Sequence, residues 1–200
     1  MLRTVAKLLK AGRDGDAAIG ATGDDGVRLP LSFAELRALV AATVGVLNGN
    51  GVGRNDRVAM VLPNGPEMAA SFLAIAAGAA AAPLNPAYRE AEFDFYIGDL
   101  KPKALVIQRG MDSPVRAVAA KHGVPIFELV PLADGPTGTF DLEAPNRASP
   151  PSHADPGDIA LILHTSGTTA RPKMVPLTQS NICATARHIG ATLALGPCDV

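Results

Sequence analysis

The feature that most constrains the fold is an alternation of short apolar runs with longer segments of helical periodicity. Runs rich in Val, Ile, Leu, Met and Ala predict buried strands, whereas the segments between them repeat apolar side chains every three to four positions, as helices do. Strands that are apolar throughout and alternate with helices indicate a parallel sheet covered on both faces. The sequence therefore predicts an α/β fold with a doubly wound, mainly parallel sheet. The predicted strands are residues 57–62, 104–107, 125–129 and 158–163, followed by an extended segment at 174–177.

Punctuating residues mark the ends of the predicted helices. Ser32 is a candidate N-cap for a helix over residues 31–48, because Glu35 follows three positions later and completes a capping box. An alanine-rich stretch, residues 68–82, is predicted to be one helix ended by Pro83. Its 15 residues are fewer than the about 20 that a membrane span requires, so a helix packed inside the domain is favoured. The other predicted helices are residues 1–10, 90–100, 113–122 and a segment from Thr178 or Ser180 to residue 195.

The charge balance excludes partners that bind through a broad electrostatic surface. The 18 Lys and Arg residues nearly cancel the 19 Asp and Glu residues, so neither nucleic acid nor an anionic membrane is indicated. Cys183 and Cys198 lack metal-ligand spacing and are too few for a disulfide scaffold. The first ten residues have no secretory pattern, and a surface helix is favoured there over a basic transit peptide. A reducing, cytoplasmic location is expected.

A proline- and glycine-rich stretch divides the sequence. Residues 133–157 contain five prolines among Ser, Thr, Asp and Gly, which is typical of a connecting segment or a long surface loop. The predicted organisation is a first α/β lobe over residues 1–132, this connector, and the start of a second α/β lobe over residues 158–200.

One polar loop carries the candidate chemistry. It directly follows the predicted strand at 158–163 and combines four hydroxyls, a glycine and two cations. Hydroxyls and loop N–H groups donate to phosphate oxygens, the glycine lets the backbone approach closely, and the cations stabilise the most anionic phosphates. The loop is therefore predicted to bind a polyphosphate. The candidate residues are Thr165, Ser166, Gly167, Thr168, Thr169, Arg171 and Lys173.

The residues of this region also bear on other interpretations. A Walker A loop requires glycine before its lysine and Ser or Thr after it, whereas Pro172 and Met174 flank Lys173. Composition alone leaves a plain polar turn open, because Ser, Thr and Gly cluster in many loops. His164 is favoured as a packing residue at the strand end over a ligand of substrate or nucleotide. Tyr88 and Tyr96 are likewise predicted to pack, Cys183 to be buried, and Arg89 and Arg116 to be solvated.

The order of residues in the loop carries a family resemblance. Residues 165–175, Thr-Ser-Gly-Thr-Thr-Ala-Arg-Pro-Lys-Met-Val, resemble the phosphate-loop signature Thr-Ser-Gly-Thr-Thr-Gly-x-Pro-Lys-Gly-Val of the adenylate-forming superfamily. Its members include acyl-CoA synthetases, coumarate-CoA ligases, luciferases and peptide-synthetase adenylation domains. Ala170 and Met174 depart from it, since both replace glycine. The loop with its flanks is most similar to oxalate-CoA ligases and related bacterial acyl-CoA synthetases. Further similar segments are residues 32–36, 56–65, 72–80 and 82–86, so the likeness covers nearly the whole chain.

The resemblance implies a two-step reaction. A carboxylic acid substrate attacks the α-phosphate of MgATP to give an acyl-adenylate and pyrophosphate, and a thiol, usually CoA, then takes the acyl group. Residues 165–169 and Lys173 would hold the phosphates that leave as pyrophosphate. Their contribution would be positioning and charge stabilisation rather than covalent catalysis. The implied cofactors are ATP, Mg²⁺ and CoA.

The resemblance also implies that other functional segments follow position 200. These are the adenine- and ribose-binding segments, the glutamate that helps to hold magnesium, the acyl pocket and a C-terminal lysine. We therefore expect an N-terminal fragment in which no catalytic residue or metal ligand can be assigned and which does not catalyse adenylation alone. Two other interpretations stay open: a truncated, non-catalytic module that binds nucleotide or pyrophosphate, and one half of a split enzyme whose partner carries the remainder.

Overall fold

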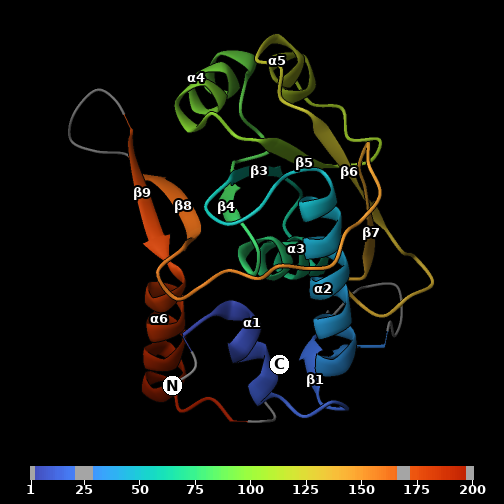
Figure 1. Cartoon of the computed structure of the whole chain (residues 1–200), viewed down its shortest axis with the longest axis vertical. Coiled ribbons are helices and arrows are strands. Elements are labelled where there is room, and N and C mark those ends of the chain that lie inside the picture. Colours follow the sequence, from blue (N-terminus) through green and yellow to red (C-terminus); the bar gives the residue numbers. More distant parts are fainter. Residues whose placement is uncertain (1–2, 21–28, 166–171, 197–200) are drawn as a thin grey trace.

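The computed structural model describes residues 3–20, 29–165 and 172–196. Within these residues a mainly parallel sheet has the strand order β7-β6-β5-β3-β4-β8-β9, with helices over both faces (Figure 1). The inner pairs are parallel, whereas β7 and β9 join the two edges antiparallel. The predicted α/β fold is confirmed. The strands are β3 (Arg57–Val61), β4 (Ala80–Pro83), β5 (Ala104–Gln108), β6 (Ile126–Pro131), β7 (Phe140–Glu143), β8 (Ile159–Thr165) and β9 (Lys173–Thr178).

The helices and a small second sheet complete the described chain. A short antiparallel pair, β1 (Ala17–Ile19) with β2 (Leu31–Ser32), precedes the large sheet. No helix in the described ranges combines the length and the apolar character that crossing a membrane requires. The helices are α1 (Val5–Leu8), the 3-10 turn η1 (Leu9–Ala11), α2 (Phe33–Gly49), α3 (Pro66–Ala76), α4 (Glu90–Leu100), α5 (Val115–Lys121) and α6 (Gln179–Thr192).

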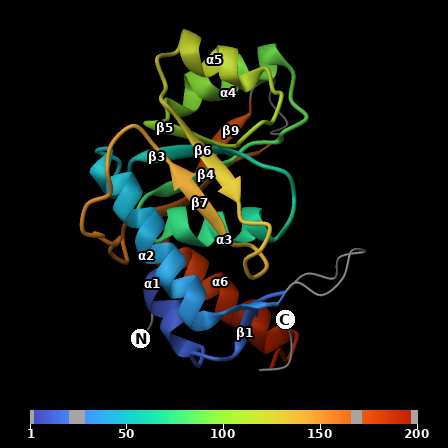
Figure 2. The same ribbon diagram turned by 90° about the vertical axis from the view of Figure 1, so that its right-hand side faces the viewer.

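The sheet is doubly wound because successive crossovers cover opposite faces. From β3 the chain reaches β4 through α3, and it then returns through α4 to β5 on the other side of β3. Helices α2 and α3 lie against one face and α4 and α5 against the other (Figures 1 and 2). Side chains along β3 alternate between the two cores. Val58 and Met60 join the core that contains α2 and α3, and Ala59 and Val61 join the core that contains α4 and α5.

Two local predictions are confirmed in detail. Ser32 caps α2: its Oγ accepts from the backbone N of Glu35 at 3.3 Å, and Glu35 Oε2 accepts from the backbone N of Ser32 at 2.9 Å. The helix predicted over residues 90–100 is α4 with the same bounds. Both signals are local in sequence, which is why the pattern alone determines them.

The alanine-rich segment departs from its prediction. Helix α3 ends at Ala76, and β4 occupies Ala80–Pro83, so a helix through residue 82 is wrong. Gly78 lies between them, where an added Cβ would be 2.8 Å from a methyl group of Val44 in α2. β4 lies between β3 and β8, and its alanines are buried. A central strand covered by helices on both faces accommodates small side chains, and this packing overrides the helical propensity of alanine.

Strand β7 lies inside the segment that the sequence predicts as a connector. It pairs antiparallel with β6 at one edge of the sheet. Phe140 is buried, whereas Asp141 and Glu143 are exposed. Because β7 alternates apolar and polar residues and lies among prolines, its sequence resembles that of a loop. The division into lobes at residues 1–132 and 158–200 stays a prediction; β8 pairs with β4 in the same sheet as the earlier strands.

A buried glutamine connects three helices. Gln179, the first residue of α6, is fully buried. Its Oε1 accepts a hydrogen bond from the backbone N of Val5 at 2.9 Å, and its Nε2 donates to the backbone carbonyl of Ala76. One side chain therefore pairs with a backbone donor of α1 and a backbone acceptor at the end of α3. Buried backbone groups of this kind need a hydrogen-bond partner.

We expect Gln179→Met to lower the free energy of unfolding by about 2–4 kcal/mol, because it leaves a buried donor and a buried acceptor unpaired. Urea unfolding followed by circular dichroism measures the change. The matched control is Gln108→Met at the half-buried end of β5, which should change stability by less than about 0.5 kcal/mol. Equal losses in the two variants would mean that Gln179 contributes only side-chain volume.

Candidate phosphate-binding site

The β8–β9 hairpin frames the loop that the sequence singles out. Thr165, the last residue of β8, pairs with Lys173, the first residue of β9. The hydroxyl of Thr165 donates to the backbone carbonyl of Lys173 at 3.5 Å. Residues directly opposite on antiparallel strands share a face, so both side chains lie on the same side of the hairpin, and both are exposed. A hydroxyl donor and an ammonium group therefore flank the ends of the loop.

The hairpin lies at the edge of the sheet where this fold holds ligands. β4 and β8 pair in parallel through Ala81 and Leu161, so both strands end at the same edge. In doubly wound sheets, ligands bind outside the carboxyl ends of the strands. The loop that leaves β8 and the segment that leaves β4 toward α4 both begin at this edge.

His164 attaches the end of β8 to α4. Its Nε2 lies 3.1 Å from Oδ2 of Asp99, and its ring meets Tyr96 edge to face at a centroid distance of 4.8 Å. Only 7% of its side chain is exposed. The prediction that His164 packs at the strand end is confirmed, because its contacts are with α4.

Two tyrosines extend this contact. Tyr96 stacks on Tyr88 with ring centroids 4.9 Å apart and an interplanar angle of 14°. Burial, with a contribution from the neighbouring Tyr96 hydroxyl, raises the pKa of Tyr88 to about 12, so Tyr88 stays neutral at physiological pH. The predicted packing role of both tyrosines is confirmed. They connect the segment after β4, helix α4 and the end of β8.

Met174 replaces a glycine of the family signature without disturbing the face that carries the lysine. It pairs with His164 in the hairpin register, one position along from the pair formed by Thr165 and Lys173. Alternation along a strand therefore directs Met174 to the opposite face, where it packs against the core that contains α4 and α5.

A buried carboxylate holds the beginning of β8. Asp158 accepts two hydrogen bonds from the guanidinium of Arg54, at 2.6 and 3.2 Å, and one from the side-chain amide of Asn55 at 2.9 Å. The backbone N of Asp155 donates to it at 2.7 Å. The Arg54 guanidinium, with help from these amides, holds the pKa of Asp158 below its ordinary value. The turn before β3 and the start of β8 are thereby joined.

Arg116 contradicts its sequence prediction. It forms a two-pronged ion pair with Glu128 of β6, at 2.6 and 3.2 Å, and donates to the backbone carbonyls of Gln108 and Met111. It therefore connects α5 to the end of β5 and to the middle of β6 and is not merely solvated. Arg89 is exposed, as predicted, and Cys183 is buried.

Two of the seven candidate residues lie within the described part of the chain. Thr165 and Lys173 come together at the hairpin, whereas Ser166, Gly167, Thr168, Thr169 and Arg171 lie outside the described residues. The candidate residues offer hydroxyl and ammonium groups, which donate hydrogen bonds. They therefore fit an anionic phosphate rather than a metal cation. In the described ranges no three His, Cys, Asp or Glu side chains gather as metal ligands. Sequence reasoning missed Asp158 and Arg54, since a carboxylate before a strand is also an ordinary turn residue.

The fold and the hairpin define a class of α/β proteins in which a loop leaves a strand at the carboxyl edge of a mainly parallel sheet. The family model described as AMP-binding enzyme matches residues 12–200, so the chain belongs to this family. The resemblance to acyl-CoA synthetases noted in the sequence is thereby confirmed at the level of the family.

The relatives of this chain include acid–CoA ligases. The chain is 36% identical over 178 residues to the probable CoA ligase CCL9 of Humulus lupulus, covering 84% of this chain and 33% of that protein. It is 36% identical over 173 residues to the oxalate–CoA ligase of Saccharomyces cerevisiae, covering 74% and 32%. The ATP-bound MatB from Rhodopseudomonas palustris shares its fold with a TM-score of 0.70 at 28% identity, covering 96% of this chain and 38% of that one. The chain spans about a third of the length of these curated relatives.

The pH dependence of stability tests the anchor at Asp158. Its pKa lies below 3.8 in the folded state, so the ionised carboxylate stabilises the fold fully above about pH 5, and this contribution is lost as the pH falls through the folded pKa. We expect the difference in unfolding free energy between wild type and Asp158→Asn to be largest near neutral pH and to shrink at low pH. Urea titrations across this range measure it. A difference independent of pH would contradict the role of the charge.

A second variant tests the contact between β8 and α4. We expect His164→Ala to lower the free energy of unfolding by about 1–3 kcal/mol, because it removes the hydrogen bond to Asp99 and the aromatic contact with Tyr96. His188→Ala on the exposed side of α6 is the matched control and should change stability by less than about 0.5 kcal/mol. The anchoring role is wrong if chemical denaturation gives the same value for both variants.

Proposed function

We propose that this chain is the N-terminal portion of an ATP-dependent acid–thiol ligase. The parent reaction would activate a carboxylate as an acyl-adenylate and transfer the acyl group to CoA. Membership of the AMP-binding enzyme family and the similarity to acid–CoA ligases support this proposal. The similarity to a structure titled as ATP-bound supports ATP as the nucleotide.

The observation that carries the proposal is the pairing of Thr165 with Lys173 across the hairpin. It presents a hydroxyl and a cation on one exposed face at the carboxyl edge of the sheet. Developing negative charge on a departing pyrophosphate is stabilised by such preorganised donors. The lysine can act there as a point charge, whereas the hydroxyl orients one phosphate oxygen through a directional hydrogen bond.

Each candidate residue has a role in this proposal. Ser166, Thr168 and Thr169 donate hydroxyl hydrogen bonds to phosphate oxygens, Thr165 does so in place of its long hydrogen bond to the carbonyl of Lys173, and Gly167 lets the backbone N–H groups approach. Lys173 and Arg171 neutralise the charge of the leaving phosphates. When bound with the nucleotide, Mg²⁺ would offset part of the negative charge of the phosphates. None of these residues forms a covalent bond to the substrate, so this part of the chain binds and orients the nucleotide.

The proposal divides the reaction between this chain and the further length that its relatives possess. The binding of adenine, the metal ligands of the protein, the acyl pocket and the thiol step are assigned to that further length. This chain alone would then bind nucleotide phosphates without turnover.

Lys173→Met tests the phosphate role. We expect the chain to bind MgATP and pyrophosphate, and the substitution to raise both dissociation constants by about tenfold or more, because a charge-assisted hydrogen bond contributes about 1.5–3 kcal/mol. Isothermal titration calorimetry measures both ligands. Lys101→Met, at the exposed C-terminal end of α4, is the matched control and should leave both constants unchanged. The phosphate role is wrong if wild type binds neither ligand, or if both variants bind alike.

Turnover tests the division of labour. The chain is incubated with ATP, Mg²⁺ and a panel of carboxylates, and ATP–pyrophosphate exchange is followed. We expect nucleotide binding without exchange. Exchange with any acid would contradict the assignment of catalytic groups to the further length, while it would support the ligase activity itself.

A further inference from the structure

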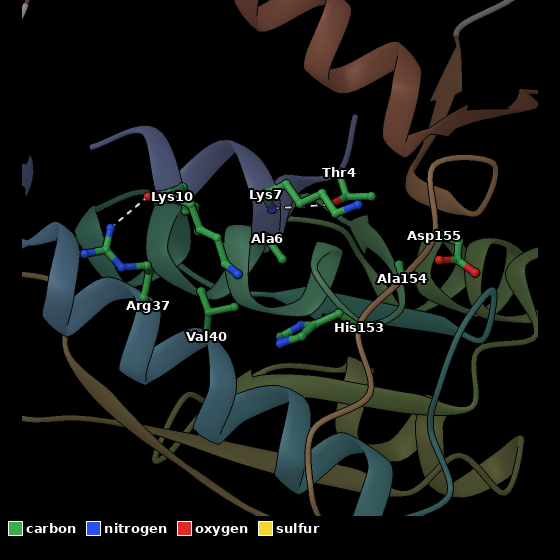
Figure 3. Close-up of a pocket in the computed structure, with 10 residues that line it drawn as sticks. Thr4, Ala6, Lys7, Lys10, Arg37, Val40, His153, Ala154 and Asp155 are labelled. Carbon is green, nitrogen blue, oxygen red and sulfur yellow. Dashed lines mark hydrogen bonds between the residues drawn. The ribbon is translucent and has the colours of Figure 1, made fainter. Parts of the chain in front are cut away.

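A second concave site lies away from the hairpin. A cavity of about 310 Å³ opens between α1, α2 and the segment that precedes β8 (Figure 3). None of the residues that line it belongs to β8 or β9. Its volume falls at the lower end of the range for small-molecule sites, about 300–1,000 Å³. The candidate phosphate site therefore does not account for it.

The floor of this cavity is apolar. Leu9 and Val40 contribute branched side chains from η1 and α2, and Ala6 of α1 and Ala154 before β8 add their methyl groups. Leu9, Val40 and Ala154 are 8%, 3% and 6% exposed, so the floor is rigid core rather than loose surface. A ligand that rests here must present hydrocarbon, because these side chains offer no hydrogen bonds.

The rim of the cavity carries lysine charge that no carboxylate among the described residues neutralises. Lys10 and His153 extend from opposite sides toward the space between α1 and α2, whereas the side chain of Lys7 runs along α1 toward Thr4 (Figure 3). Neither Lys7 nor Lys10 has an ion-pair partner among residues 3–20, 29–165 and 172–196. An anion held by Lys10 gains attraction without displacing an existing ion pair.

The other two charged residues of the lining are already engaged. Arg37 donates to the backbone carbonyls of Leu9 and Gly12, at 2.9 and 3.2 Å, and pairs with Asp14, so it forms the wall. Asp155 pairs with Arg54 at 2.7 Å and lies beyond Ala154, at the far end of the lining in Figure 3. The one carboxylate of the lining therefore leaves the charge of Lys10 uncompensated.

We propose that this cavity binds an aliphatic monocarboxylate of about eight carbon atoms. The carboxylate accepts from Lys10 and His153, and the hydrocarbon chain lies on Leu9, Val40 and the two alanines. The volume lies at the lower end of the range for small-molecule sites, so an acid of medium length such as octanoate matches it better than a long-chain acid. A polyphosphate does not fit this lining, because its several oxygens need a cluster of donors where the floor is hydrocarbon. The site goes beyond the proposed ligase function and does not depend on it.

A ligand series tests the proposal without altering the protein. Calorimetric titration of the chain with butyrate, hexanoate and octanoate should give dissociation constants that tighten by about threefold to fourfold per added methylene. The gain should stop once the chain exceeds the cavity, so dodecanoate should bind no tighter than decanoate. Octanol and inorganic phosphate, which supply only the tail or only the charge, should bind at least tenfold more weakly than octanoate. Equal binding of octanol, or no saturable binding of octanoate, overturns the proposal.

Two variants locate the site. Lys10→Met should weaken octanoate about threefold to fivefold and leave octanol unchanged, because it removes one partly exposed charge and keeps the length of the side chain. Ala6→Phe should abolish binding of both by filling the floor. Lys101→Met, on the α4 side of the sheet, is the matched control and should bind octanoate as wild type does. Circular dichroism confirms that each variant is folded. If octanoate affinity is the same in all four proteins, this cavity is not its site.

Discussion

The position of the hairpin depends on the small side chains of β4. This strand lies between β3 and β8, and its three alanines are at most 1% exposed. Helices cover both faces of the sheet at this point, so larger side chains would force either a helix or a neighbouring strand outward. The positions of β8, β9 and α6 depend on β4, because β8 lies between β4 and β9 in the sheet and β4 connects it to the other strands.

The hairpin is then anchored at two points that come from different parts of the chain. Asp158 ties the start of β8 to Arg54 and Asn55 in the turn before β3, and His164 ties its end to Asp99 of α4. The first anchor is ionic and the second is a hydrogen bond supported by aromatic packing. A binding loop supported by a rigid frame needs less reordering when it meets a ligand. In the proposed phosphate site, this frame would supply orientation and the loop would supply donors.

Sequence reasoning succeeded where the signal is local. The capping box of Ser32, the bounds of α4 and the ordered string at residues 165–175 each lie within a few positions of one another. It failed where distant packing decides. The alanines of β4 form a strand only because helices enclose them, and Arg116 is engaged only because β6 brings Glu128 beside α5. The same limit applies to the site, since the pairing of Arg54 with Asp158 joins residues 104 positions apart.

The hydrogen bond between the backbone N of Val5 and the side chain of Gln179 has a consequence for folding during synthesis on the ribosome. These residues are 174 positions apart, so the first helix must wait for almost the whole described chain to emerge before this bond can form. The inner strands β3 to β6 lie close in sequence and can pair earlier, whereas β8 reaches its place late. Until then β4 presents an unpaired edge of small apolar residues, the kind of surface that chaperones protect in a nascent chain.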